Sequence, residues 1–127
     1  MNRSIWEFLV KGKEPVIRTW LKDKDISVRD QAKLDYALQR LRSLDRALIS
    51  PKLLAEVGDK ILKLRVRCEN RELRPMLCRG PVGDPLDYSL LVGALEIGDE
   101  LHPGNAKEKA KEHRADLVRN AKWRQIF

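Results

Sequence analysis

ILKLRVRCENRELRPMLCRG, residues 61–80, is the stretch that decides the fold. Apolar and polar residues alternate on both sides of Asn70-Arg71, which is typical of two strands joined as a β-hairpin. Six of the residues in this stretch are Lys or Arg. We therefore expect strands over 61–68 and 72–79 that place several like charges side by side.

Taking Asn70-Arg71 as a two-residue turn fixes the register of this hairpin. Leu64 then faces Leu77 on an apolar side that belongs to the core, and Arg67 faces Arg74 on the charged side. Like charges opposite one another weaken a strand pair, by something on the order of the 0.2–1 kcal/mol that favourable pairs contribute. An anion between the two guanidinium groups reverses the sign of this interaction, since arginine binds phosphate through two parallel hydrogen bonds. We therefore interpret the charged side as a phosphate-binding face.

A plainer interpretation of the hairpin stays open. Glu69 and Glu72 are close enough in sequence to pair with the arginines, and a one-residue slip in register would separate Arg67 from Arg74. In that case the charges form an ordinary solvated face.

Composition points to one domain, residues 1–127, with an anionic partner. The chain carries a net charge of +7 and has a pI of about 9.6, which favours nucleic acid first and an acidic protein second. Its two cysteines, Cys68 and Cys78, point to opposite faces of the predicted hairpin and show no metal-type spacing, so we expect free thiols and neither a metal nor a cofactor. The N-terminal segment lacks a long apolar run, so we expect a cytoplasmic protein without a membrane span.

The remaining pattern predicts a small α+β domain. Ser27 and Asp30 resemble a capping box, and leucines recur on one face of the helix that follows. Its basic residues lie largely away from that stripe: Arg29, Lys33, Arg40 and Arg42. The expected elements are a strand at 5–10, helices at 15–24, 28–46 and 50–58, strands at 61–68, 72–79 and 88–97, and a helix at 105–120. This order predicts a mostly antiparallel sheet of about four strands, with N-terminal helices and one C-terminal helix.

Three segments in this order resemble the RelE/HigB toxin superfamily, in particular its phage-derived HigB-like branch. They are the hairpin itself, then LLVGALEIG, and finally AKEHRADL near the C-terminus. The matching positions are Leu64–Arg67, Arg74–Cys78, Leu90–Ala94 and Ala110–Asp116.

The resemblance implies a RelE/ParE-like fold and a specific activity. Such a protein is the toxin of a type II toxin–antitoxin pair, an endoribonuclease that cuts mRNA on the ribosome and is held inactive by a partner antitoxin. Cleavage needs no metal: the ribose 2′-OH attacks its own phosphodiester, helped by general acid–base chemistry and by cations that stabilise the phosphorane. By this resemblance Arg67 and Arg74 are catalytic candidates. The secondary candidates, for RNA binding, are Lys63, Arg65 and Arg79.

His102 is a third catalytic candidate, because an imidazole suits proton transfer near neutral pH. It lies in the segment EIGDELHPG, where the superfamily usually carries basic residues and this chain carries Glu96, Asp99 and Glu100. His102 in such a loop is alternatively a plain solvated residue.

Two other functions remain open. The acidic segment favours a non-catalytic binding module for RNA or an acidic protein. A ParE-like gyrase inhibitor would depend on the C-terminal segment instead. The tail KWRQIF, residues 122–127, either contacts RNA or a partner or packs back onto the domain.

Overall fold

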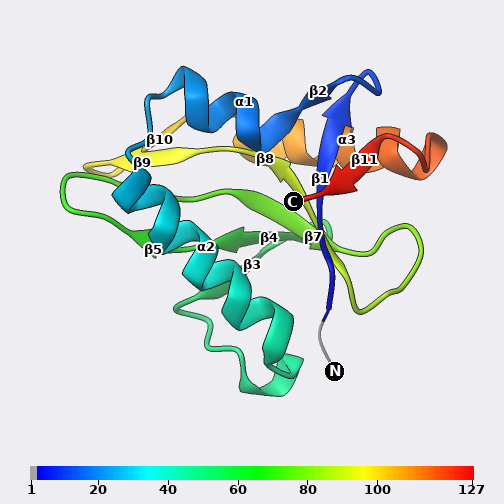
Figure 1. The fold of residues 1–127 in the computed structure, drawn as a ribbon, viewed down its shortest axis with the longest axis horizontal. Helices are drawn as coiled ribbons and strands as arrows, with labels where there is room; N and C mark the ends of the chain where they lie inside the picture. Colours follow the sequence, from blue (N-terminus) through cyan, green and yellow to red (C-terminus); the bar gives the residue numbers. More distant parts are fainter. Residues whose placement is uncertain (1–2) are drawn as a thin grey trace.

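Three α-helices and two β-sheets make up the computed structural model, which describes residues 3–127 (Figure 1). The helices are α1 (Val16–Asp23), α2 (Val28–Ser43) and α3 (Ala106–Arg119), with a 3₁₀ turn η1 (Arg46–Leu48) after α2. The α+β class expected from the sequence is confirmed, with two helices before most of the strands and one after them.

The larger sheet has seven strands in the order β11-β1-β8-β7-β4-β3, with β2 paired to β1. Neighbouring strands are antiparallel except β1 and β8, which run parallel. The bounds are β1 (Ile5–Val10), β2 (Glu14–Pro15), β3 (Leu54–Gly58), β4 (Ile61–Leu64), β7 (Met76–Arg79), β8 (Tyr88–Val92) and β11 (Arg124–Ile126).

A second sheet of four short strands extends from the first, in the order β10-β9-β6-β5. Its strands are β5 (Val66–Arg67), β6 (Glu72–Leu73), β9 (Leu95–Ile97) and β10 (Glu100–His102). Each of the three long strands expected from the sequence is divided between the two sheets, with interruptions at Arg65, Arg74-Pro75 and Gly93-Ala94. The sequence therefore predicted too few strands and only one sheet, whereas the described residues form sheets of seven and four strands.

Two hydrophobic cores lie on opposite sides of the larger sheet. One contains leucines of α1 and α2 packed against strand residues such as Leu64, Leu77 and Leu90. The other contains Ala110 and Leu117 of α3 packed against further strand residues. In Figure 1, α2 crosses in front of the strands and α3 lies behind them.

Helix α2 forms where the sequence predicts it. The Ser27 hydroxyl accepts a hydrogen bond from the Asp30 backbone N–H at 3.1 Å, which satisfies one of the free donors of the first turn. Leu34, Leu38 and Leu41 follow at helical spacing and are 1% exposed or less. This leaves the opposite face of α2, with Lys33 and its arginines, at the surface.

The helix expected at 50–58 is wrong. Leu53 N–H and Leu54 N–H both donate to the Ser50 carbonyl, which makes a single turn. The chain then enters β3 and pairs with β4, and Gly58, Asp59 and Lys60 turn back with positive φ angles. Ser50, Pro51 and Gly58 resemble helix boundaries, but the intervening segment gains more backbone hydrogen bonds at the edge of the sheet than an isolated turn would keep.

The C-terminal tail packs back onto the domain, as one of the two interpretations held. Strand β11 pairs with β1, with Trp6 opposite Ile126. Trp123 packs against the α3 core and Phe127 against the α2 core. Cys68 and Cys78 lie in different cores and are free thiols, in agreement with their predicted opposite faces.

Candidate nucleic-acid interface

The register of the basic hairpin differs from the expected one by two residues. Cys68 N–H donates to the Arg71 carbonyl at 3.0 Å, so the turn is centred on Glu69-Asn70. Arg67 consequently faces Glu72, not Arg74. A shift of two residues leaves every side chain on its expected face, because side chains alternate with period two. The apolar side was therefore predicted correctly, while the Arg67–Arg74 pairing was wrong. The expected charged side was wrong in part, because Met76 and Cys78 on it are buried in the core beneath α3.

Arg74 lies at the centre of an ion-pair network and is only 8% exposed. Its Nη2 contacts the carboxylates of Glu72 and of Glu96, the latter at 3.1 Å. Burial lowers the pKa of Arg74, an effect that the Glu96 carboxylate opposes. Two glutamates on neighbouring strands thus balance the charge of this guanidinium group, so it needs no external anion, although its Nε is buried without a hydrogen-bond partner among the described residues.

His102 does not join the two arginines. Directly paired residues of neighbouring strands share a face of the sheet. Two rows cross the smaller sheet: Arg67, Glu72, Glu96 and Leu101 on one face, and Val66, Leu73, Leu95 and His102 on the other. His102 is exposed at the sheet edge, where its Nε2 lies 3.9 Å from a Glu100 carboxylate oxygen.

The three residues expected to bind RNA lie in different parts of the structure. Lys63 pairs with Met76, which belongs to the core beneath α3. Arg79 lies 3.7 Å from Glu56. Arg65 is exposed between β4 and β5, and its backbone N–H donates to the Leu53 carbonyl at 2.8 Å. Of the three, only Arg65 stays with Arg67.

A basic groove forms where α2 crosses the segment 65–67. Its volume is about 380 Å³. Its charged and aromatic lining residues are Lys33, Tyr36 and Arg40 from α2 with Arg65 and Arg67 from the hairpin. We call this the α2 groove. Its remaining lining residues within 3–127 are apolar, and none of them is a carboxylate.

The cations of the α2 groove are accessible. Arg67 has an 89% exposed side chain and one acidic neighbour in the described chain, Glu72, at 3.4 Å. Within residues 3–127, the side chains of Lys33, Arg40 and Arg65 form no ion pair. Tyr36 is 69% exposed, which is high for a large aromatic residue in a structural role. Proteins that bind single-stranded nucleic acid commonly use accessible cations to bind the phosphates and an exposed aromatic ring to stack on a base.

Sequence reasoning found only half of the α2 groove. It singled out Arg65 and Arg67 on the hairpin and assigned Lys33 and Arg40 to the solvent face of the helix. Lys33, Tyr36 and Arg40 follow the i, i+3, i+7 spacing of a single helical stripe, which the sequence could have shown. The crossing of that stripe over residues 65–67 depends on tertiary packing.

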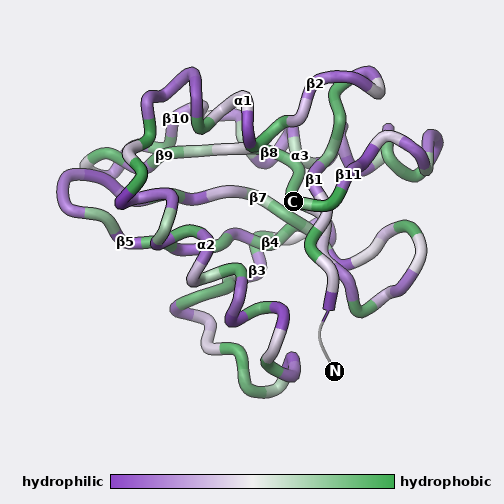
Figure 2. The backbone as a smooth tube through the Cα atoms, viewed as in Figure 1, coloured by the Kyte–Doolittle hydropathy of each residue, from purple (hydrophilic) through white to green (hydrophobic). Residues whose placement is uncertain are grey.

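The groove continues into a second depression of mixed charge. Lys33 also lines this neighbour, together with Arg29 and Arg71 on the basic side and Asp30 and Glu69 on the acidic side. In Figure 2 the loop joining β5 and β6, which carries Glu69 and Arg71, is largely hydrophilic. The carboxylates at this end limit the uniformly basic surface to the α2 groove itself.

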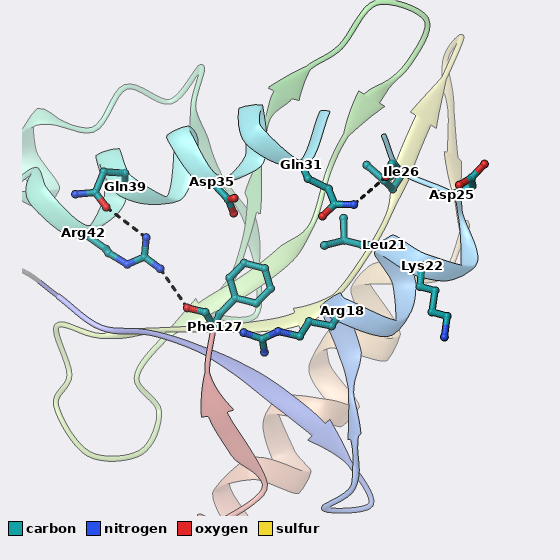
Figure 3. A pocket seen from close by; sticks show the side chains of 10 residues that line it. All are labelled: Arg18, Leu21, Lys22, Asp25, Ile26, Gln31, Asp35, Gln39, Arg42 and Phe127. Carbon is teal, nitrogen blue, oxygen red and sulfur yellow. Dashed lines mark hydrogen bonds between the residues drawn. The ribbon is translucent and has the colours of Figure 1, made fainter. Parts of the chain in front are cut away.

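A larger cavity lies elsewhere, between α1, α2 and the C-terminal residue (Figure 3). Its volume is about 800 Å³. Phe127 lies between Arg18, whose guanidinium carbon is 4.8 Å from the ring centre, and Arg42, which donates to the Phe127 carbonyl at 3.5 Å. Asp25 and Asp35 line the same cavity. Because this cavity also contains carboxylates and its Arg18 and Arg42 already contact Phe127, it is a less suitable binding site for a polyanion than the α2 groove.

No protein-family model, no curated protein and no solved structure matches this chain. In the part of the chain that the structure describes, no helix is long and apolar enough to cross a membrane. Residues 3–127 also contain no group of three or more His, Cys, Asp or Glu side chains arranged to hold a metal ion.

Proposed function

We propose that this chain is the toxin of a type II toxin–antitoxin pair, an endoribonuclease that acts on mRNA at the ribosome and holds the RNA backbone in the α2 groove. Two kinds of support stand behind the proposal: the RelE/HigB resemblance of the sequence and the composition of the groove. The observation that carries it is the gathering, among the described residues, of four accessible cations and an exposed tyrosine in one groove without a carboxylate.

The groove residues have distinct roles in this proposal. Arg65 and Arg67 bind the non-bridging phosphate oxygens and stabilise the charge that grows on them as the 2′-oxygen bonds to phosphorus and the 5′-oxygen leaves. Lys33 and Arg40 hold the neighbouring phosphates. Tyr36 stacks on a base or donates its phenol to the strand. Arg74 keeps Glu72 and Glu96 in place, which is a structural role.

A second candidate function is RNA binding without cleavage. Its support is that no histidine of residues 3–127 lines the α2 groove and that Arg74 is already neutralised by two glutamates. Both functions require the groove to bind RNA, and they differ only in whether the bound strand is cut.

The first experiment measures RNA binding by fluorescence anisotropy with a single-stranded oligoribonucleotide over a range of salt concentrations. For single strands, each phosphate that a protein neutralises contributes about 0.7 to the slope of log K against log salt. We expect Arg65→Gln/Arg67→Gln to weaken binding and to reduce the slope by about 1.4. The matched control, Arg119→Gln/Lys122→Gln, removes two exposed cations from the end of α3 and the loop after it, and should leave the slope nearly unchanged.

The second experiment maps the 5′ ends of cellular mRNA after brief induction of the wild type and of both double variants. Cuts within translated codons that disappear only in Arg65→Gln/Arg67→Gln would support the toxin. Salt-dependent binding with an unchanged map would support the binding module. Equal binding by both variants would refute the α2 groove as the RNA site.

The proposal includes a cognate antitoxin protein as a partner. Co-expression of a small protein encoded next to this chain should then relieve its toxicity and copurify with it.

A further inference from the structure

A cavity of about 480 Å³ lies between α1, the end of β8 and the connection from β10 into α3. It shares no described residue with the α2 groove. Four basic side chains line it: Lys24, His102, Lys109 and His113. Among residues 3–127, no carboxylate lines it. We call it the α1/α3 cavity.

These four groups have little or no competing acid. Across the described residues, Lys24, Lys109 and His113 form no ion pair, and His102 meets only Glu100, at 3.9 Å. Lys24, His102 and Lys109 are exposed where they line the cavity, and His113 is half-buried. Solvent therefore reaches the cavity, and both ammonium groups attract an anion that enters it.

His113 is held with one nitrogen available. Its Nδ1 lies 2.7 Å from the Leu91 carbonyl oxygen, and the ring stacks on Phe8 with centroids 4.6 Å apart. Since a carbonyl only accepts hydrogen bonds, Nδ1 carries a proton. The Nε2 atom then has no hydrogen-bond partner within residues 3–127 and can bond to a ligand in the cavity.

The apolar wall of the cavity is closely packed. Trp20 is 8% exposed, and a Cβ atom placed on Gly93 would lie only 2.1 Å from Trp20 Cδ2. Gly93 is therefore required for the indole to lie against β8. The indole Nε1 is buried without a hydrogen-bond partner among the described residues. Pockets for small ligands typically combine an apolar, closely packed wall with a few polar or charged side chains. The α1/α3 cavity has both features.

We propose that the α1/α3 cavity is a binding site for a phosphate monoester. Lys24 and Lys109 neutralise the dianion, and His102 donates a hydrogen bond to one of its oxygens. Nε2 of His113, the acceptor nitrogen of this tautomer, receives a hydrogen bond from a donor group on the organic part of the ligand. The volume exceeds what a phosphate group alone occupies and lies within the range of small-molecule pockets, so there is room for an organic group beside Trp20. The site does not depend on RNA binding in the α2 groove.

Isothermal titration calorimetry of the full chain tests this site with two probes, inorganic phosphate and adenosine 5′-monophosphate. We expect saturable one-to-one binding of at least one probe by the wild type. Lys24→Gln/Lys109→Gln should weaken it at least tenfold. The matched control, Lys22→Gln/Lys111→Gln, removes the same charge from the last turn of α1 and from α3, at positions outside the cavity, and should bind like the wild type.

His102→Gln adds a second test, because this exposed side chain can be changed with little risk to folding. It should weaken binding several-fold. Tighter binding of the nucleotide than of phosphate would identify an organic phosphate as the ligand, and equal binding would identify the phosphate group alone. Absence of saturable binding by the wild type, or equal weakening in the control, would overturn the proposal. Arg65→Gln/Arg67→Gln should bind both probes normally, which separates this result from the α2 groove.

Discussion

Arg74 carries its charge into a nearly buried position because two glutamates from neighbouring strands meet it there. Glu72 and Glu96 face each other across β6 and β9, and both contact the same guanidinium nitrogen. Without the arginine, two partly buried carboxylates would stand side by side. The acidic segment EIGDELHPG thus supplies a structural partner for a basic strand residue.

Arg74→Met should destabilise the fold by roughly 2–4 kcal/mol, because breaking a buried pair leaves uncompensated charge while replacing it entirely costs much less. Urea unfolding followed by circular dichroism measures the difference. The triple variant Arg74→Met/Glu72→Gln/Glu96→Gln should recover most of the loss. Wild-type stability in Arg74→Met alone would show that the network contributes nothing to folding.

At the scale of elements, the segments 61–67, 72–79 and 88–97 each pass from one sheet into the other. Each is interrupted where it leaves the first sheet, at Arg65, Arg74-Pro75 and Gly93-Ala94. The interruption in the hairpin is stabilised by backbone bonds across it: Leu64 N–H donates to the Pro75 carbonyl at 3.0 Å, and Arg74 N–H donates to the Ala94 carbonyl at 2.8 Å. Pro75 lacks an N–H and cannot continue the ladder from its own nitrogen. Gly93 allows Trp20 of α1 to approach β8 at the third interruption.

Gly93→Ala should destabilise the protein by about 1–3 kcal/mol, since the added methyl group overpacks the contact between α1 and β8. Gly104→Ala is the matched control, because the nearest atom to a Cβ there is the Leu101 carbonyl oxygen at 3.8 Å. Thermal unfolding of the two variants should therefore differ clearly. Equal transition temperatures would mean that Trp20 relaxes without cost.

At the scale of the whole molecule, the larger sheet separates two cores, and each contains one cysteine. Cys78 lies beneath α3 and is completely buried, and burial raises the pKa of its thiol from 9.0 to about 11. Burial also raises the pKa of Cys68 in the other core, with the Asp30 carboxylate adding to the effect. Ionisation of Cys78 below its folded pKa requires the sheet and α3 to separate, which amounts to unfolding.

The free energy of unfolding should consequently fall between about pH 9 and 11. In this range the unfolded chain loses the Cys78 proton while the folded protein keeps it, so deprotonation favours the unfolded state. The expected loss is about 2–3 kcal/mol. Cys78→Ala should lack this part of the pH dependence in urea unfolding, and a curve parallel to that of the wild type would contradict the assignment.

The local pattern determined the elements whose causes are local. Ser27 marks the start of α2, and the leucines at 34, 38 and 41 mark its buried face. The alternation of apolar and polar residues over 61–79 predicts which side chains share a face of the hairpin. The short strands β10 and β11 carry no such pattern, because they form only by pairing with β9 and β1, and β1 lies at the opposite end of the chain from β11.

The sequence by itself determined the fold class, the positive charge and the apolar side of the hairpin, but not that Met76 and Cys78 on its other side belong to a second core. Only the tertiary structure decided the register, which depends on where the turn closes. A shift of two residues leaves the alternation unchanged while it exchanges the partner of Arg67 from Arg74 to Glu72. The tertiary structure likewise decided that Lys33 and Arg40 meet Arg65 and Arg67 in one groove. Alternation is a property of neighbouring residues, whereas the convergence of charges from separate elements follows from how α2 packs on the sheet.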